Sequence, residues 1–423
     1  METYLFEEHH QVLGHWYGRG VKGKTLVCFD AHLDVQFIAA DRIQRLLDAE
    51  SVVQVERLAK PHHLFPEQGF SYSIEDFLYA AFRLGIIERL VWVAPPHVSI
   101  EHSASSIDEL TQMKGVALAD AHSFRLIAPG ASDAIAGQLL GLPITICRHN
   151  DLARLNLPTD TLIDIDIDYF VSLPGDQLGT DPAVIAATLD ALPLNDPQRT
   201  ISLSYHSGFL PHRFRPLASD LVRHWTGRSV TLPDVPNCPT QKACAVAARM
   251  LDVSLDTVMQ WAMESQQIDG RVVGLNGSAE TQQAITATAF GLLWVELRRV
   301  DRAMHCYQIA AQGLGYQGEL ALEIGKALCD LDQHRRAIEF LADATRDDKT
   351  CAAAWYFGAI AHHSLCLHQE AIQWAERAHH ETPLWSAPMS LLSDLYQQTG
   401  DRERAAAFVQ KNKSTRAAIT ATT

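Results

Sequence analysis

Two short segments in the first half of the chain carry side chains that could bind metal ions. The first is the sequence D-A-H-L-D, directly after an apolar run, and its polar members are Asp30, His32 and Asp34. The second is an apolar run at 162–170 in which every second residue from 164 is an aspartate: Asp164, Asp166 and Asp168. Side chains two apart on a strand share a face, so we expect these carboxylates in one row. Because like charges repel and burial of each carboxylate is costly, a buried row needs cations nearby.

The combined donor set indicates the kind of ion. Carboxylate oxygens and imidazole nitrogens without thiolates suit Mn²⁺ or a related divalent ion better than structural zinc. The set is also larger than one catalytic ion needs, which favours two ions that bridge a hydroxide. Two other interpretations remain open: a solvent-facing edge strand for the aspartate row, and a capped turn for D-A-H-L-D. The isoleucines between the aspartates make an edge strand awkward.

The two segments together resemble the ureohydrolase superfamily, which includes arginase and agmatinase. Histone deacetylases share that fold but have D-x-H in the second segment and keep one zinc, whereas this chain has Asp168 there. The opening EEHHQVL (7–13), with SIEDFLYAAF (73–82), LVWVAP (90–95) and DIDIDYF (164–170), is similar to a narrower group, the peptide arginases. The resemblance covers roughly residues 4–220. It implies conversion of arginine side chains in a ribosomally made precursor peptide to ornithine, with release of urea.

The resemblance also implies two Mn²⁺ ions and their ligands. The first ion would be held by His9, Asp30, Asp34 and Asp166. The second would be held by Asp30, His32, Asp166 and Asp168. The usual G-G-D-H motif for the upstream histidine is absent, so His9 takes that place by position and its neighbour His10 could serve instead. Asp164 falls one step behind the ligands as a supporting residue.

The groups that would contact substrate are less clear. No loop that would hold the amino and carboxylate groups of free arginine is visible after Asp34, and the later strand TISLSYHSGF (200–209) contains no acid. The carboxylate that grips the guanidinium is therefore sought among Glu75, Asp76 and Glu101. Ser73 and Asp76 also read as a helix capping box. His206 is a candidate proton shuttle to the leaving amine, with a plain loop residue as the alternative.

These residues need a framework that brings them together, and the first half of the chain predicts an α/β fold. Short apolar segments rich in β-branched and aromatic residues predict strands at 25–30, 89–94, 123–128, 144–147, 161–168 and 200–205. Helices are predicted between them at 74–85, 131–141 and 182–192. This alternation favours a three-layer, arginase-like domain with a parallel sheet. Sites on such sheets form at the carboxyl ends of the strands.

The last third of the chain has a 34-residue period, marked by Ala303, Ala337, Ala371 and Ala405. This period predicts an all-α array of tetratricopeptide-like (TPR) repeats rather than a helical bundle with accidental spacing. Gly291 and Gly325 fall at the close contact between the two helices of a repeat, where Ala359 and Ser393 replace the glycine. The predicted organisation is a metallohydrolase domain at 1–235, a helical connector at 236–280, the repeats at 281–415 and a tail at 416–423.

Composition narrows the partners and the compartment. The 423 residues are 47% hydrophobic and 20% charged, with a formal net charge of −15, which argues against nucleic acid as a partner. We expect a cytoplasmic protein without a membrane segment, since no signal peptide or apolar span is visible. The concave face of the repeats would bind the precursor peptide or a protein partner. Alternative functions are a small-guanidine ureohydrolase, a deacetylase of the same fold, or a non-enzymatic scaffold with a structural metal site. The oligomeric state stays open.

Overall fold

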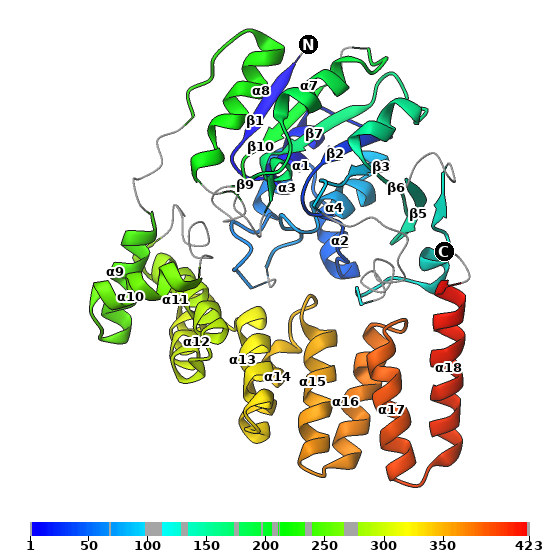
Figure 1. Ribbon diagram of the computed structural model, residues 1–423, viewed down its shortest axis with the longest axis vertical. Helices are drawn as coiled ribbons and strands as arrows, with labels where there is room; N and C mark the ends of the chain where they lie inside the picture. The colour runs from blue at the N-terminus through cyan, green and yellow to red at the C-terminus, as the bar shows by residue number, and fades with distance from the viewer. Residues whose placement is uncertain are drawn as a thin grey trace.

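The computed structural model describes residues 2–66, 69–97, 112–127, 134–172, 177–195, 198–204, 210, 212–232, 239–265 and 278–420. It has two parts, an α/β domain followed by a long row of paired helices (Figure 1). An α/β domain followed by an α-helical array agrees with the predicted fold class. None of the described helices is long and apolar enough to cross a bilayer.

An eight-stranded sheet forms the centre of the first part, in the order β1-β10-β7-β2-β3-β6-β5-β4. The strands are β1 (Thr3–Phe6), β2 (Lys24–Phe29), β3 (Ile87–Val93), β4 (Arg125–Leu126), β5 (Ile135–Leu139), β6 (Leu142–Cys147), β7 (Leu162–Asp166) and β10 (Arg199–Ser202). From β1 to β6 in this order the neighbours pair in parallel, whereas β5 and β4 are antiparallel additions at the edge. The sheet is therefore mixed: the predicted parallel pairing holds from β1 to β6, and β5 and β4 extend it in the antiparallel direction. A separate ribbon joins β8 (Val171–Ser172) and β9 (Gln177–Leu178).

The edge differs because one predicted helix is a strand. The segment 131–141 was expected to be helical, but its described part contains β5, which forms a hairpin with β6. Leu140 and Gly141 join the two strands with φ angles of 53° and 80°, the left-handed conformation that tight hairpin turns need. Pairing with β6 thus overrides the helix-like composition of this segment.

Helices cover both faces of the sheet, as the three-layer prediction required. Alternate residues of β2 separate the two cores: Leu26 and Cys28 pack with one set of helices, and Val27 and Phe29 with the other. The first face is covered by α1 (Gln11–Gly18), α2 (Ala40–Leu47), α3 (Val52–Arg57) and α4 (Phe77–Arg83). The second face is covered by α7 (Pro182–Asp190) and α8 (Pro216–Thr226). Short helical turns complete the domain: α6 (Leu118–Ala121), η1 (His149–Arg154), η2 (Ile167–Phe170) and η3 (His212–Phe214).

The second part is built of helical hairpins. A first hairpin, α9 (Pro239–Leu251) and α10 (Leu255–Ser265), shares its core with the array that follows. The array comprises α11 (Ala279–Glu296), α12 (Val300–Leu314), α13 (Gly318–Asp330), α14 (His334–Ala344), α15 (Cys351–Ser364), α16 (His368–Glu381), α17 (Ser386–Gln398) and α18 (Arg402–Thr420). The four period-marking alanines lie in the second helix of each pair and are buried. A β-carbon on Gly291 would lie 2.5 Å from the side chain of Leu320, so this position requires a residue without one.

The two parts are packed against each other. Leu384, in the turn between α16 and α17, belongs to the core of the α/β domain, while Leu64 of the α/β domain belongs to the core of the array. Figure 1 shows helices α13 to α18 standing in a row with their ends toward the α/β domain. The turns between successive repeats therefore meet the domain that carries the predicted metal ligands.

Candidate metal centre

The two ligand-bearing segments leave neighbouring strands at the same edge of the sheet. β2 and β7 pair in register with Phe29 opposite Ile165, so Asp30 and Asp166 follow at equal height. Trp92 on β3 donates a hydrogen bond from its indole nitrogen to the backbone oxygen of Asp30 at 3.0 Å, which fixes the start of the loop. Asp34 has a φ of 47°, a left-handed conformation that non-glycine residues adopt rarely and often at functional sites.

His9 lies at the centre of the carboxylates. Its Nδ1 atom is 3.0 Å from Asp34 Oδ2 and 3.2 Å from one oxygen each of Asp30 and Asp166. The imidazole is fully buried and approaches from the segment between β1 and α1. Three carboxylate oxygens and one nitrogen thus converge on one point.

Asp164 determines which nitrogen of His9 faces that point. Its carboxylate oxygen is 2.6 Å from His9 Nε2, and the hydroxyl of Thr200 donates to its other oxygen. A carboxylate only accepts, so Nε2 carries a hydrogen, and Nδ1 is the nitrogen that faces the other three aspartates. An imidazole held by a carboxylate in this way is the usual arrangement behind a metal-binding histidine.

A second convergence lies beside the first. His32 Nδ1 is 2.9 Å from Asp168 Oδ2 and 3.7 Å from Asp30 Oδ1, and one atom from each of the three residues falls within 4.8 Å of the others. Asp30 therefore belongs to both groups. Asp168 does not continue the strand row, because β7 ends at Asp166 and Asp168 lies in the following turn, η2. This turn brings its carboxylate over to the D-A-H-L-D loop, where the backbone nitrogen of Ala31 donates to it at 3.2 Å.

The pKa values in the cluster are shifted by the close packing of several carboxylates. Burial opposes protonation of His9, yet the Asp164 carboxylate raises the pKa of His9 well above its usual value. Burial also works against a charge on His32, but Asp168 raises the pKa of His32 to about 12. Burial, together with the charge of Asp166, raises the pKa of Asp168 to about 7. The buried carboxylates thus favour positive charge at this point of the structure.

Three atoms of the cluster fit a bound cation. Within the described part of the chain, His9 Nδ1, Asp30 Oδ2 and Asp168 Oδ2 are buried and have no hydrogen-bond partner. Buried polar atoms are rarely left in this state, and all three are ligand atoms of divalent metals. The donor set and these atoms therefore fit two divalent ions.

Two buried neighbours, His10 and Cys28, do not join the carboxylates around His9 Nδ1. His10 is buried, and burial lowers the pKa of its imidazole to about 4, but its ring lies against Tyr72 rather than among the carboxylates. Cys28 stands near Asp164 and His9 on the Nε2 side, a proximity that the sequence analysis did not anticipate. Burial raises the pKa of the Cys28 thiol well above its usual value, so it remains a neutral packing residue here.

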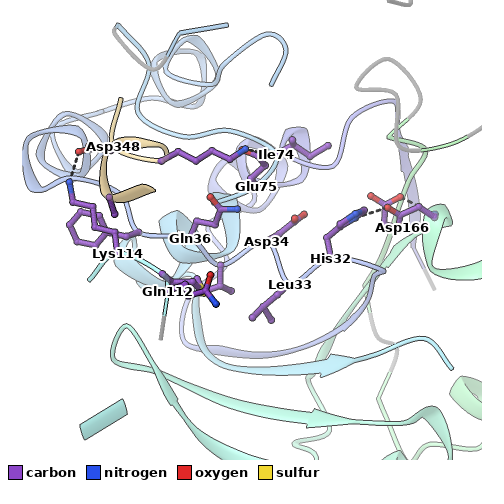
Figure 2. Close-up of a pocket in the computed structure, with 16 residues that line it drawn as sticks. His32, Leu33, Asp34, Gln36, Ile74, Glu75, Gln112, Lys114, Asp166 and Asp348 are labelled. Carbon is purple, nitrogen blue, oxygen red and sulfur yellow. Dashed lines mark hydrogen bonds and ion pairs between the residues drawn. The ribbon is translucent and has the colours of Figure 1, made fainter. Parts of the chain in front are cut away.

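The cluster opens into a cavity of about 470 Å³ between the α/β domain and the array. His32, Asp34, Asp166 and Asp168 line its inner end. In Figure 2, His32 and Asp166 lie on one side, Lys114 and Asp348 lie on the other, and Asp34, Glu75 and Gln36 lie between them. Apolar side chains form much of the remaining wall: Leu33, Val35, Phe37, Ile74, Met113 and Ala352.

The candidate substrate groups have different positions. Glu75 lines the cavity and forms an ion pair with Lys349 of the array. Asp76 accepts a hydrogen bond from the backbone nitrogen of Ser73 at 2.6 Å and lies 3.5 Å from Arg42. Its carboxylate is therefore engaged by groups at the start of α4. Glu101 and His206 lie outside the described residues. Lys349, Asp348 and Lys114 were not found from sequence, because no local motif marks them as cavity residues.

No protein-family model matches this sequence, and no curated protein does. Among solved structures, a crystal structure of MamA is similar, with a TM-score of 0.31 and 17% identity over 36% of this chain and 91% of that chain. YrrB, described as a TPR protein with an unusual peptide-binding site, is similar with a TM-score of 0.30 and 17% identity over 42% of this chain and 87% of its own. The description of the helix pairs here as TPR-like depends on their own 34-residue spacing and packing.

Proposed function

We propose that this protein is a binuclear Mn²⁺-dependent hydrolase that converts arginine side chains of a peptide to ornithine and releases urea. One observation carries the proposal: a single histidine nitrogen, His9 Nδ1, lies within 3.2 Å of carboxylate oxygens of Asp30, Asp34 and Asp166. Such a point, buried and mostly anionic, is untenable without cations.

The chain's own residues would divide the work between two ions. The first set is His9, Asp30, Asp34 and Asp166, and the second is Asp30, His32, Asp166 and Asp168. Asp164 and Thr200 orient His9, while Ser204 donates a hydrogen bond to Asp166 and so holds that carboxylate in place. When bound, a pair of divalent ions supplies a more acidic attacking water and positive charge beside the reacting carbon.

The cavity supports a substrate with an aliphatic stem and a cationic end. Apolar walls from Leu33, Phe37 and Ile74 suit the methylene groups of such a substrate. Glu75 adds a carboxylate to the same cavity that His32 lines. Burial works against the charge of Glu75, but Lys349, then Lys60 and last His32 lower its pKa, so Glu75 and His32 are close enough to interact. An arginine side chain has this combination of stem and charge, whereas an acetylated lysine is neutral and cannot form an ion pair with Glu75.

The test is mass spectrometry of an arginine-containing peptide incubated with Mn²⁺-loaded protein. The expected product is lighter by about 42 Da per converted arginine, the difference expected for urea release from a guanidine. Colorimetric urea must appear in equal amount, and Asp168→Asn serves as the matched inactive control. Acetate release from an acetyl-lysine peptide would favour the deacetylase instead. If protein that holds two ions releases neither urea nor acetate, that result would favour a scaffold with a structural metal site.

A further inference from the structure

The helical array forms part of the wall of the metal cavity. Asp348 and Lys349 lie in the turn between α14 and α15, and Ala352 lies in the first turn of α15. All three line the same cavity as His32 and Asp34. Any molecule that reaches the metal ligands through this cavity therefore passes residues of the array.

Lys349 brings a positive charge into that cavity and places it on Glu75. The two side chains form an ion pair, with 32% of the lysine side chain and 19% of the glutamate side chain exposed. Burial works against the charge of Lys349, but Glu75 raises the pKa of its amine above the usual value. Within the described residues, the Glu75 carboxylate is thus already matched with an aliphatic stem that ends in a cation.

Lys349 also has other acids within reach. Glu319 and Asp347 contribute to the raised pKa of its amine, after Glu75. Both acids line a small cavity of about 20 Å³ behind the turn, and Lys349 borders this cavity as well as the metal cavity. If another cation pairs with Glu75, the amine of Lys349 keeps Glu319 and Asp347 as negative neighbours.

We propose that Glu75 receives the cationic end of the substrate side chain and that Lys349 occupies this place until the substrate displaces it. The inference builds on the proposed function, since it concerns the selectivity of the same cavity. It makes Lys349 a residue that determines specificity: a neutral side chain gains nothing by displacing it, whereas a cationic one restores the pair on Glu75. Charge selection is thereby shared between the α/β domain and the array.

The experiment measures binding, without turnover, of a capped lysine peptide to the Mn²⁺-loaded full chain by calorimetry in about 0.15 M salt. This probe carries the charge and stem but has no guanidinium carbon to attack, and its acetyl-lysine counterpart is the neutral control. Lys349→Met is expected to tighten binding of the lysine peptide about tenfold, because the competing cation is gone. Glu75→Gln is expected to weaken it by a similar factor. In the Glu75→Gln background, Lys349→Met should change the affinity by less than about twofold.

Two further variants separate this pair from the general charge of the cavity. Lys349→Arg keeps the competing cation and should bind the lysine peptide like the parent, which also shows whether the turn tolerates substitution. Lys114→Met removes another cation that lines the same cavity and pairs with Asp348 and Glu381. Two results would overturn the proposal. One is that Lys114→Met tightens binding of the lysine peptide as much as Lys349→Met does. The other is that Lys349→Met tightens binding by the same factor in the Glu75→Gln background. Because no urea is measured, failure of the ureohydrolase assignment and failure of this inference give different results.

Discussion

At the level of single residues, the spacing of the aspartates predicted which side chains come together, but not the way in which they meet. D-A-H-L-D stood out as a candidate ligand segment because it directly follows an apolar strand, and the aspartates stood out because they alternate with isoleucines in another. The family resemblance placed Asp164 as a supporting residue, but the sequence could not show that its partner is the ring of His9, 155 residues away. Nor could the sequence show that β7 ends at Asp166, because Ile167 and Tyr169 continue the strand-like alternation in the turn η2.

Asp164 gives a test at this scale. Asp164→Asn keeps a hydrogen-bond acceptor but removes the charge that holds His9 Nε2–H, so Mn²⁺ affinity should fall about 10 to 100-fold. Asp168→Asn removes a ligand itself and should lower metal content and activity further. Thr200→Val, which removes only the hydroxyl donor to Asp164, is the milder control. Metal analysis after dialysis gives the readout. If Asp164→Asn and Asp168→Asn lost both ions equally, the division into ligand and support would be wrong.

At the level of elements, periodicity identified the strands and helices with long or repeated patterns and failed at short ones. The strands β2, β3 and β7 are mostly buried and rich in Val, Ile and Leu, whereas β1 has only TYLF, which was not recognised. The segment around β5 has the small and apolar composition of a helix, and only its pairing with β6 makes it a strand. The 34-residue period succeeded because four units repeat the same constraint, the close crossing of two helices.

This close crossing predicts the effect of a single added group. A β-carbon on Gly325 would lie 2.6 Å from Cγ of Leu341, so Gly325→Val should overpack the crossing of α13 and α14. We expect a loss of about 1–3 kcal/mol in the stability of the array, measured by urea denaturation followed by circular dichroism. Combining it with Leu341→Ala, which removes the clashing side chain, should cost less than the sum of the two single changes. Additive losses would show that the two residues do not meet.

At the level of the whole molecule, the sequence suggested two parts but could not show how they dock. The docking contacts join residues far apart in sequence, such as Leu384 with the α/β core and Lys114 with Asp348. The array was expected to act through its concave face, and that binding role stays a prediction. The described residues add a second position for the array, since the turn between α14 and α15 and the first turn of α15 line one side of the cavity.

Lys114 tests whether this docking is held by charge. Its amine lies 2.7 Å from Asp348 and 3.0 Å from Glu381, and all three side chains are less than a third exposed. Lys114→Glu would replace two attractions by two repulsions, so the turns after α14 and α16 should separate from the α/β domain.

Hydrogen exchange of the full chain measures that separation. The backbone nitrogens of Cys351 and Trp385, bonded to Asp347 and Thr382, should exchange faster in Lys114→Glu than in Lys114→Met, which removes attraction without adding repulsion. The sheet amides should not change. Salt at about 1 M shortens the reach of charge to roughly 3 Å and should return the Lys114→Glu protein toward the behaviour of Lys114→Met. Unchanged exchange at both turns would mean that apolar contacts such as Leu384 hold the array without help from these ion pairs.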